Sequence, residues 1–171
     1  MGKKVAVLVT DLVEEIELTD PKKHLEEAGH TVELIEQEAG KVITGKNGES
    51  FTIDKGIDEV NADSYDALLV PGGYSPDKLR ADERNAAFAR EFIKAKKPVF
   101  AICHGPQFLI DTDQLKGITV TGYKSIRKDL INAGANFVDE EVVVDQNIVT
   151  SRTPADLPAF NREALKLLEN E

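Results

Sequence analysis

Short apolar runs alternate along the chain with longer stretches of helical period. Runs of four or five apolar residues stand at 5–9 and 67–70, and the segment 18–28 carries apolar positions at helical spacing before Gly29. Short runs that are apolar throughout are typical of strands buried on both faces, and helices are the usual connections between parallel strands. The alternation therefore predicts an α/β fold with a largely parallel sheet.

Further apolar runs and turn signals complete this pattern. Asn47-Gly48 is a two-residue hairpin signal between two short β-prone runs, and Pro106 falls in the first turn of a helix expected after Cys103. No repeat or break in composition divides residues 1–171, so we expect one domain. The other expected elements are strands at 31–35, 98–102 and 118–121, helices at about 77–95, 125–133 and 154–168, and a hairpin over 142–150.

Charge and cysteine content narrow the possible partners. Lys and Arg total 21 against 31 Asp and Glu, a net charge of −10, so the overall field opposes phosphate backbones and anionic lipids. We expect neither a nucleic-acid nor a membrane partner, and a small or neutral substrate instead. The first apolar run is too short for a signal peptide, and a single free thiol suits a reducing compartment, so we expect a cytoplasmic protein.

The segment around Cys103 carries the candidate chemistry. An apolar strand over 98–102 ends at Cys103, and His104-Gly105-Pro106 opens a helix directly afterwards. This is the arrangement of a nucleophile elbow, with cysteine in place of serine. A lone cysteine is more often a small buried core residue, but this context favours a reactive thiol at the carboxyl edge of the sheet. The adjacent helix N-terminus predicts a pKa for the Cys103 thiol below that of a free cysteine.

Two further segments are expected at the same edge. Pro71-Gly72-Gly73 ends the strand next to the elbow, and paired glycines let backbone N–H groups approach a bound oxyanion, as the N–H of His104 would. The acidic run 14–17 follows the first strand. Acids in such a run usually form a solvated helix start, but Glu17 stands where a loop after the first strand opens onto the candidate site.

Together these segments, with 131–135 and the tail 149–157, resemble the PfpI, or intracellular protease I, family of the class I glutamine-amidotransferase-like superfamily, and its bacterial general stress proteins in particular. The match covers essentially the whole chain in the right order, and Cys-His-Gly-Pro-Gln at 103–107 is its most specific part. The resemblance implies a flavodoxin-like, three-layer α/β/α sandwich with a mostly parallel central sheet and a nucleophile elbow.

The resemblance also implies roles for individual residues. Cys103 would be the nucleophile and His104 its general base, while the amides of Gly73 and His104 would form the oxyanion hole. Glu17 matches the acid that hydrogen-bonds the cysteine sulfur. For Glu17 to donate that hydrogen bond it must be protonated, so its pKa should be raised by burial and by its coupling to the thiol.

The other residues implied by the resemblance line the pocket or come from a second subunit. Glu14, Gly72 and Tyr123 would line the pocket. In the hexameric proteases of the family a neighbouring subunit supplies a glutamate as the third triad member, and the matching position here is Asp77, which is shorter by one methylene. We therefore expect a homo-oligomer, either a dimer or a hexamer, in which Asp77 acts across an interface.

Three functions are compatible with these residues, and we expect no cofactor and no metal in any of them. The first is a cysteine hydrolase of the protease type, linked to stress response and acting on a peptide. The second is a glyoxalase or deglycase acting on methylglyoxal or glycation adducts, since both chemistries use the same thiol and oxyanion hole. The third is a redox sensor or chaperone that works through oxidation of Cys103. Glutamine amidotransfer is disfavoured, because it needs a later histidine and none follows His104.

Overall fold

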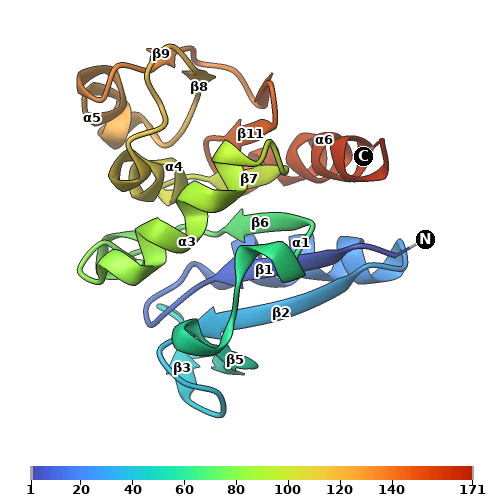
Figure 1. Cartoon of the computed structure of the whole chain (residues 1–171). Helices are drawn as coiled ribbons and strands as arrows, with labels where there is room; N and C mark the ends of the chain where they lie inside the picture. Colours follow the sequence, from blue (N-terminus) through green and yellow to red (C-terminus); the bar gives the residue numbers. More distant parts are fainter. Residues whose placement is uncertain (1, 171) are drawn as a thin grey trace.

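A seven-stranded sheet forms the centre of the molecule (Figure 1), seen here in a computed structural model that describes residues 2–170. The strand order is β10-β11-β7-β6-β1-β2-β5, and every neighbouring pair is parallel except β10 and β11. The predicted, largely parallel α/β sheet is therefore confirmed. Its strands are β1 (Lys4–Leu8), β2 (Thr31–Glu36), β5 (Lys55–Gly56), β6 (Ala67–Val70), β7 (Val99–Ile102), β10 (Val143–Asp145) and β11 (Ile148–Ser151).

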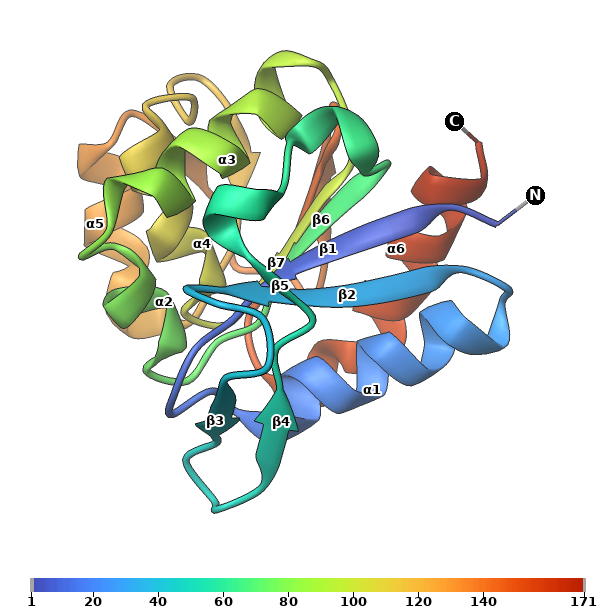
Figure 2. The ribbon, with the colours of Figure 1, turned by 60° about the horizontal axis from the view of Figure 1, so that its bottom comes forward.

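Helices cover both faces of this sheet and make three layers. Helices α1 and α6 pack on one face, and the other helices lie on the opposite face (Figure 2). Each face has its own apolar core, with Phe100 and Phe160 fully buried on the first and Phe92 and Phe108 on the second. The helices are α1 (Glu15–Glu27), α2 (Ser75–Leu79), α3 (Glu83–Lys94), α4 (Gly105–Phe108), α5 (Arg127–Asn132) and α6 (Leu157–Glu169).

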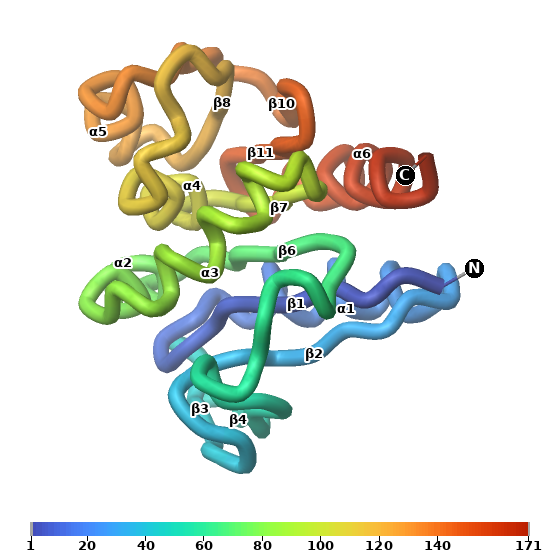
Figure 3. Tube along the Cα trace, viewed as in Figure 1, coloured from blue at the N-terminus to red at the C-terminus, as the bar shows by residue number. Residues whose placement is uncertain are grey.

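The strand order brings the candidate residues to one edge. The chain passes from β2 across β1 to β6 and then to β7, so the sheet reverses its direction of growth beside β1. In such sheets the carboxyl ends of the strands next to this switch point form the ligand-binding crevice. The path of the chain shows these ends meeting on the side of the molecule away from both termini (Figure 3).

Several helices differ from their predicted extents. α1 begins at Glu15 rather than near residue 18, and the helix expected over 77–95 is divided into α2 and α3. The division falls at Asp82, whose backbone is extended and whose side chain accepts the backbone N–H of Arg84 as the N-cap of α3. An aspartate that can cap a helix competes with the helical path through its own position. The helices predicted over 125–133 and 154–168 each begin with a 3-10 turn, over Lys124–Ile126 and Pro154–Asp156.

Both predicted hairpins are present. One joins β10 to β11, and the other, β3 (Val42–Thr44) with β4 (Ser50–Thr52), forms a small sheet of its own. Glu15 attaches this second hairpin to α1 by accepting the backbone N–H groups of Asn47 and Glu49, at 2.8 and 3.2 Å. The strand expected over 118–121 is present as β8 (Thr119–Val120), which pairs with β9 (Asn136–Phe137). Strands β5 and β9 have only two residues each, which is too short for a periodic signal.

Within residues 2–170 no helix combines the length and apolar character needed to cross a membrane.

Candidate active site

Cys103 occupies the sharp turn between β7 and α4. Its φ is +62°, a left-handed conformation that a non-glycine residue adopts at a cost of about 1–3 kcal/mol. The cost is offset by hydrogen bonds on both sides, because the Cys103 N–H donates to Ser151 O at 3.0 Å and the Tyr123 N–H donates to Cys103 O at 2.8 Å. Strain of this kind is the mark of a nucleophile elbow, as the sequence predicted.

Gly105 allows close packing and does not make the turn. The sharp turn falls at Cys103, and Gly105 itself has no positive φ. A Cβ at Gly105 would lie 2.4 Å from the carbonyl oxygen of Val70, at the end of β6. Glycine is therefore required because the start of α4 packs directly against the neighbouring strand, which brings the Pro71-Gly72-Gly73 segment next to the thiol.

Glu17 is the acid that faces this thiol. The residue is fully buried, and its Oε1 accepts the backbone N–H of Gly72 at 2.8 Å. Its Oε2 has no nitrogen or oxygen partner among residues 2–170, and the carboxyl interacts instead with the Cys103 thiol. A Cβ at Gly72 would lie 2.5 Å from Oε1, so only glycine leaves space for this carboxyl.

The surroundings of Glu17 hold its carboxyl in the neutral form. Burial, with a smaller contribution from the nearby charge of Glu14, raises the pKa of Glu17 to about 8, although the hydrogen bond from Gly72 acts in the other direction. The carboxyl is therefore protonated at neutral pH, and Oε2 carries or shares a proton beside the sulfur. The sequence predicted this raised pKa, and its direction is confirmed.

The predicted low pKa of the Cys103 thiol is wrong. Burial, and then the negative charge that Glu17 carries once ionised, raise the pKa of Cys103 to about 12, while the backbone N–H of His104 acts to lower it. Cys103 is only 9% exposed, and α4 has four residues, which is too short for a large dipole. Burial therefore outweighs the helix terminus, and the thiol needs a base to remove its proton.

His104 is placed to be that base. Its Nδ1 lies 3.5 Å from Cys103 Sγ, and its Nε2 lies 3.3 Å from the hydroxyl oxygen of Ser125. The ring stacks on Tyr123 with centroids 5.1 Å apart. Burial and the positive charge of Lys46 lower the pKa of His104, so the imidazole is neutral and able to accept a proton.

Two backbone amides point to an oxyanion hole. Gly73 has a φ of +76°, and a Cβ there would lie 2.4 Å from the backbone nitrogen of Glu14, so its loop is held tightly against the start of α1. Within residues 2–170 the Gly73 N–H has no backbone acceptor, whereas the Gly72 N–H is taken by Glu17. The amides of Gly73 and His104 therefore match the pair that the resemblance implies.

The rim of the site is more polar than the sequence indicated. Glu14 is half-buried and pairs with Lys46 of the β3–β4 hairpin at 3.1 Å, and Tyr74 is exposed beside them. Sequence reasoning missed Lys46, Tyr74 and Ser125. All three reach the site from turns whose position depends on the tertiary fold, and no local motif marked them.

The fold thus brings together all but one of the expected site residues. Asp77 is exposed on α2 and has no contact with His104 within the described chain. Its expected role across a subunit interface stays a prediction. Among residues 2–170 no group of three or more His, Cys, Asp and Glu side chains is arranged to hold a metal ion.

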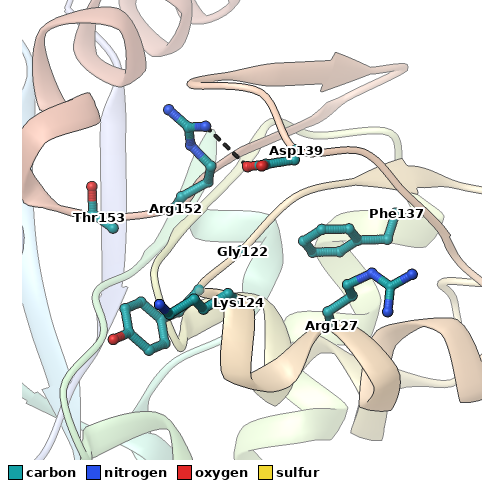
Figure 4. Close-up of a pocket in the computed structure, with 8 residues that line it drawn as sticks. Gly122, Lys124, Arg127, Phe137, Asp139, Arg152 and Thr153 are labelled. Atoms are coloured by element: carbon teal, nitrogen blue, oxygen red, sulfur yellow. Dashed lines mark hydrogen bonds and ion pairs between the residues drawn. The ribbon is translucent and has the colours of Figure 1, made fainter.

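A pocket of about 780 Å³ opens beside the site (Figure 4). It shares Tyr123 with the stack on His104, and Gly122 connects its floor to the elbow, since a Cβ there would lie 3.2 Å from Cys103 O. The pocket therefore adjoins the segment that carries the thiol. Its walls are formed by Gly122, Tyr123, Lys124, Arg127, Phe137, Asp139, Arg152 and Thr153.

A flavodoxin-like sheet with a cysteine elbow, a buried acid and a neighbouring histidine defines a class of α/β proteins built around one reactive thiol. The model of the DJ-1/PfpI family matches residues 3–167, and the chain belongs to that family. The structure of DJ-1beta from Drosophila melanogaster superimposes with a TM-score of 0.90 at 25% identity, covering 98% of this chain and 91% of that one. The family and fold predicted from the sequence are confirmed.

Three curated relatives match nearly their whole length. "Putative cysteine protease YraA" of Bacillus subtilis is 66% identical over 169 residues, covering 99% of this chain and 100% of the relative. "General stress protein 18" of the same organism is 57% identical, covering 99% of each chain. "Protein/nucleic acid deglycase 2" of Escherichia coli is 58% identical, covering 98% of this chain and 99% of the relative.

The raised pKa of Glu17 predicts a pH-dependent cost in stability. Glu17 has a pKa of about 8 in the folded protein and an ordinary value of 4.5. As pH rises between these values the folded state loses stability, because the carboxyl already ionises in the unfolded chain while it stays protonated in the folded one. We expect Glu17→Gln to raise the free energy of unfolding at pH 7 by about 2–4 kcal/mol, with almost no gain at pH 4.5. Urea unfolding at both pH values measures this.

Glu15→Gln is the matched control for that experiment. Burial alone would raise the pKa of Glu15, but the N–H groups of Glu15, Asn47 and Glu49 together lower it. Its contribution to stability is present above its ordinary pKa and is lost in acid, so its removal should destabilise the protein at pH 7. If Glu17→Gln changed the free energy of unfolding by the same amount at both pH values, the carboxyl of Glu17 would not be neutral at pH 7.

The same carboxyl should control the reactivity of the thiol. Below pH 8 the Glu17 carboxyl is neutral. Above pH 8 it is ionised, and its negative charge raises the pKa of Cys103. A glutamine at position 17 carries no charge at any pH and has no such effect. We expect the iodoacetamide alkylation rate of Glu17→Gln, divided by that of the unmodified protein, to rise about tenfold between pH 7 and pH 9.5. A constant ratio would mean that the thiol loses its proton before Glu17 does.

Proposed function

We propose that this chain is a cysteine-dependent hydrolase in which Cys103 attacks an electrophilic carbonyl carbon and water then releases the product. The observation that carries the proposal is the strained elbow, which holds the thiol between a neutral histidine and two backbone amides. A structural cysteine does not need a left-handed backbone, a base at 3.5 Å and a neighbouring Gly73 N–H without a backbone acceptor among residues 2–170. The names of the relatives support chemistry at this thiol.

The proposed first step is an addition. The thiol proton moves to Nδ1 of His104, the sulfur forms a bond to the carbonyl carbon, and the electron pair of the C=O bond moves to oxygen. The amides of Gly73 and His104 hold the negative charge that develops there. Protonated Glu17 stabilises negative charge on the sulfur before the bond forms and when it breaks.

The second step completes the hydrolysis. For an acyl substrate the tetrahedral adduct collapses, and His104 returns its proton to the leaving nitrogen. Water then attacks the thioester carbon, His104 accepts a proton from the water, and the sulfur leaves as the thiol with that proton. No oxidant or reductant is required, and the thiol, the imidazole, the two backbone amides and the Glu17 carboxyl act at one site.

Within this chemistry the deglycase reaction is the second candidate. The thiol is only 9% exposed, and it is approached beside His104 and Tyr123. A small carbonyl adduct reaches such a thiol more easily than the backbone of an extended peptide does. A relative 58% identical to this chain carries the name "Protein/nucleic acid deglycase 2", which favours the same substrate class.

We also propose a homo-oligomer located in the cytoplasm. The exposed position of Asp77 leaves its carboxylate available to a second subunit, as the resemblance implies.

Within one subunit the partner of His104 Nε2 is Ser125. For Nδ1 to accept the thiol proton, Nε2 must carry the ring hydrogen, and the Ser125 hydroxyl oxygen at 3.3 Å can accept a hydrogen bond from it and so support this tautomer.

The direct test measures turnover of three substrates by the purified protein: methylglyoxal, a glycated peptide and a fluorogenic peptide. We expect Cys103→Ala to reduce every activity present by about a thousandfold or more, because the attacking atom is gone. Circular dichroism and thermal unfolding of the variant serve as controls for the fold. Unchanged turnover in a folded Cys103→Ala protein would place the reaction at another site.

The orientation of His104 can be tested separately. We expect Ser125→Ala to lower kcat about tenfold while Cys103 stays accessible to iodoacetamide, and Ser125→Thr, which keeps the hydroxyl, to retain most of kcat. To test the role of Asp77, the turnover of Asp77→Asn chains is measured alone and again after they are mixed with Cys103→Ala chains. Full activity in Ser125→Ala would refute the role of Ser125, and recovery of activity on mixing would show that Asp77 acts from a partner subunit.

A further inference from the structure

Two cationic side chains in the pocket beside Cys103 have no ion-pair or hydrogen-bond partner among residues 2–170. Lys124 and Arg127 are exposed on consecutive turns and line the pocket, and within residues 2–170 neither side chain makes an ion pair or a hydrogen bond. Figure 4 shows Arg127 beside Phe137.

The third cation of the pocket is in the opposite situation. Arg152 donates from Nε and Nη2 to Asp156 and from Nη1 to Asp139, with all three distances between 2.9 and 3.0 Å. Each of its three guanidinium nitrogens therefore already donates a hydrogen bond, and the pair with Asp139 neutralises the carboxylate among the residues that line the pocket. Arg152 forms part of the wall, and the free positive charge comes from Lys124 and Arg127.

We propose that Lys124 and Arg127 bind an anionic group, a carboxylate or a phosphate, on the substrate whose carbonyl carbon reacts with Cys103. The proposal rests on the proposed nucleophile and narrows its substrate class. Tyr123 connects the two parts of the site, because its ring stacks on His104 and also lines the pocket. Phe137 supplies an apolar wall for the carbon atoms between the two ends of the substrate.

The chemistry of the two side chains suits this ligand. Arg127 offers a planar fork of donors that matches carboxylate and phosphate oxygens, and Lys124 adds a compact positive charge. The pocket of about 780 Å³ accommodates a chain of several atoms together with its anionic end. The carbonyl end would reach the thiol while the anionic end stays between Lys124 and Arg127.

The test uses reversible addition of aldehydes to Cys103, which requires no turnover. The sulfur bonds to the aldehyde carbon and the thiol proton is transferred to the aldehyde oxygen, and the resulting hemithioacetal protects Cys103 from iodoacetamide. Glyceraldehyde 3-phosphate is compared with glyceraldehyde, and succinic semialdehyde with butanal. Each pair differs mainly in its anionic group, so the two arms distinguish a phosphate site from a carboxylate site.

We expect at least one anionic probe to protect Cys103 at a concentration about tenfold lower than its neutral counterpart. The double variant Lys124→Gln/Arg127→Gln should remove this advantage and leave protection by the neutral aldehyde unchanged. Lys128→Gln is the matched control, because Lys128 is exposed on α5 but does not line the pocket. It should behave like the unmodified protein.

Equal protection by the anionic and neutral members of both pairs would overturn the proposal, and so would an advantage that survives in the double variant. The result differs if the hydrolase proposal is wrong and the anion site is present. No substrate is then turned over, but the anionic probe still protects the thiol more strongly than its neutral counterpart.

Discussion

The left-handed turn at Cys103 is the constraint on which the rest of the site depends. Two backbone hydrogen bonds, to Ser151 on β11 and from Tyr123, hold the residue at a φ of +62°. The same turn sends α4 back against the end of β6, where only Gly105 fits. Because the strain is maintained by neighbouring strands, the position of the sulfur is set by the sheet and not by a flexible loop.

Two acids at the start of α1 show how the surroundings decide what a carboxyl does. Glu15 accepts three hydrogen bonds from the β3–β4 hairpin, so it is stabilised as an anion and fixes the hairpin. Glu17, two residues later, faces the thiol with a single backbone donor and is held neutral by burial. Glu15 therefore stabilises the fold, whereas the buried, neutral Glu17 lowers the stability of the protein and places a proton beside the sulfur.

The sequence predicted the sheet, the elbow and most of the residues around the thiol, because a buried strand ending in Cys-His-Gly-Pro is a local signal. It did not predict the break at Asp82, where capping competes with helical period over a single residue. Ser125 and Lys46 could not be placed, since each reaches the site through a turn that depends on packing elsewhere. The pKa of Cys103 was predicted in the wrong direction because a motif shows the helix terminus but not the depth of burial.

Net charge also proves to be a poor guide to the charge at the site. The total of −10 favours a small or neutral substrate, but it is an average over the whole surface. At physiological ionic strength, exposed charges more than about 8 Å apart are largely screened from each other, so a bound group responds to its nearest neighbours. Around the thiol these include Lys46, which is already paired with Glu14, and in the adjoining pocket Lys124 and Arg127, which have no ion pair within the described part of the chain. An acidic protein can therefore present a local positive field where its substrate enters, while the acids elsewhere oppose binding of nucleic acids to the rest of the surface.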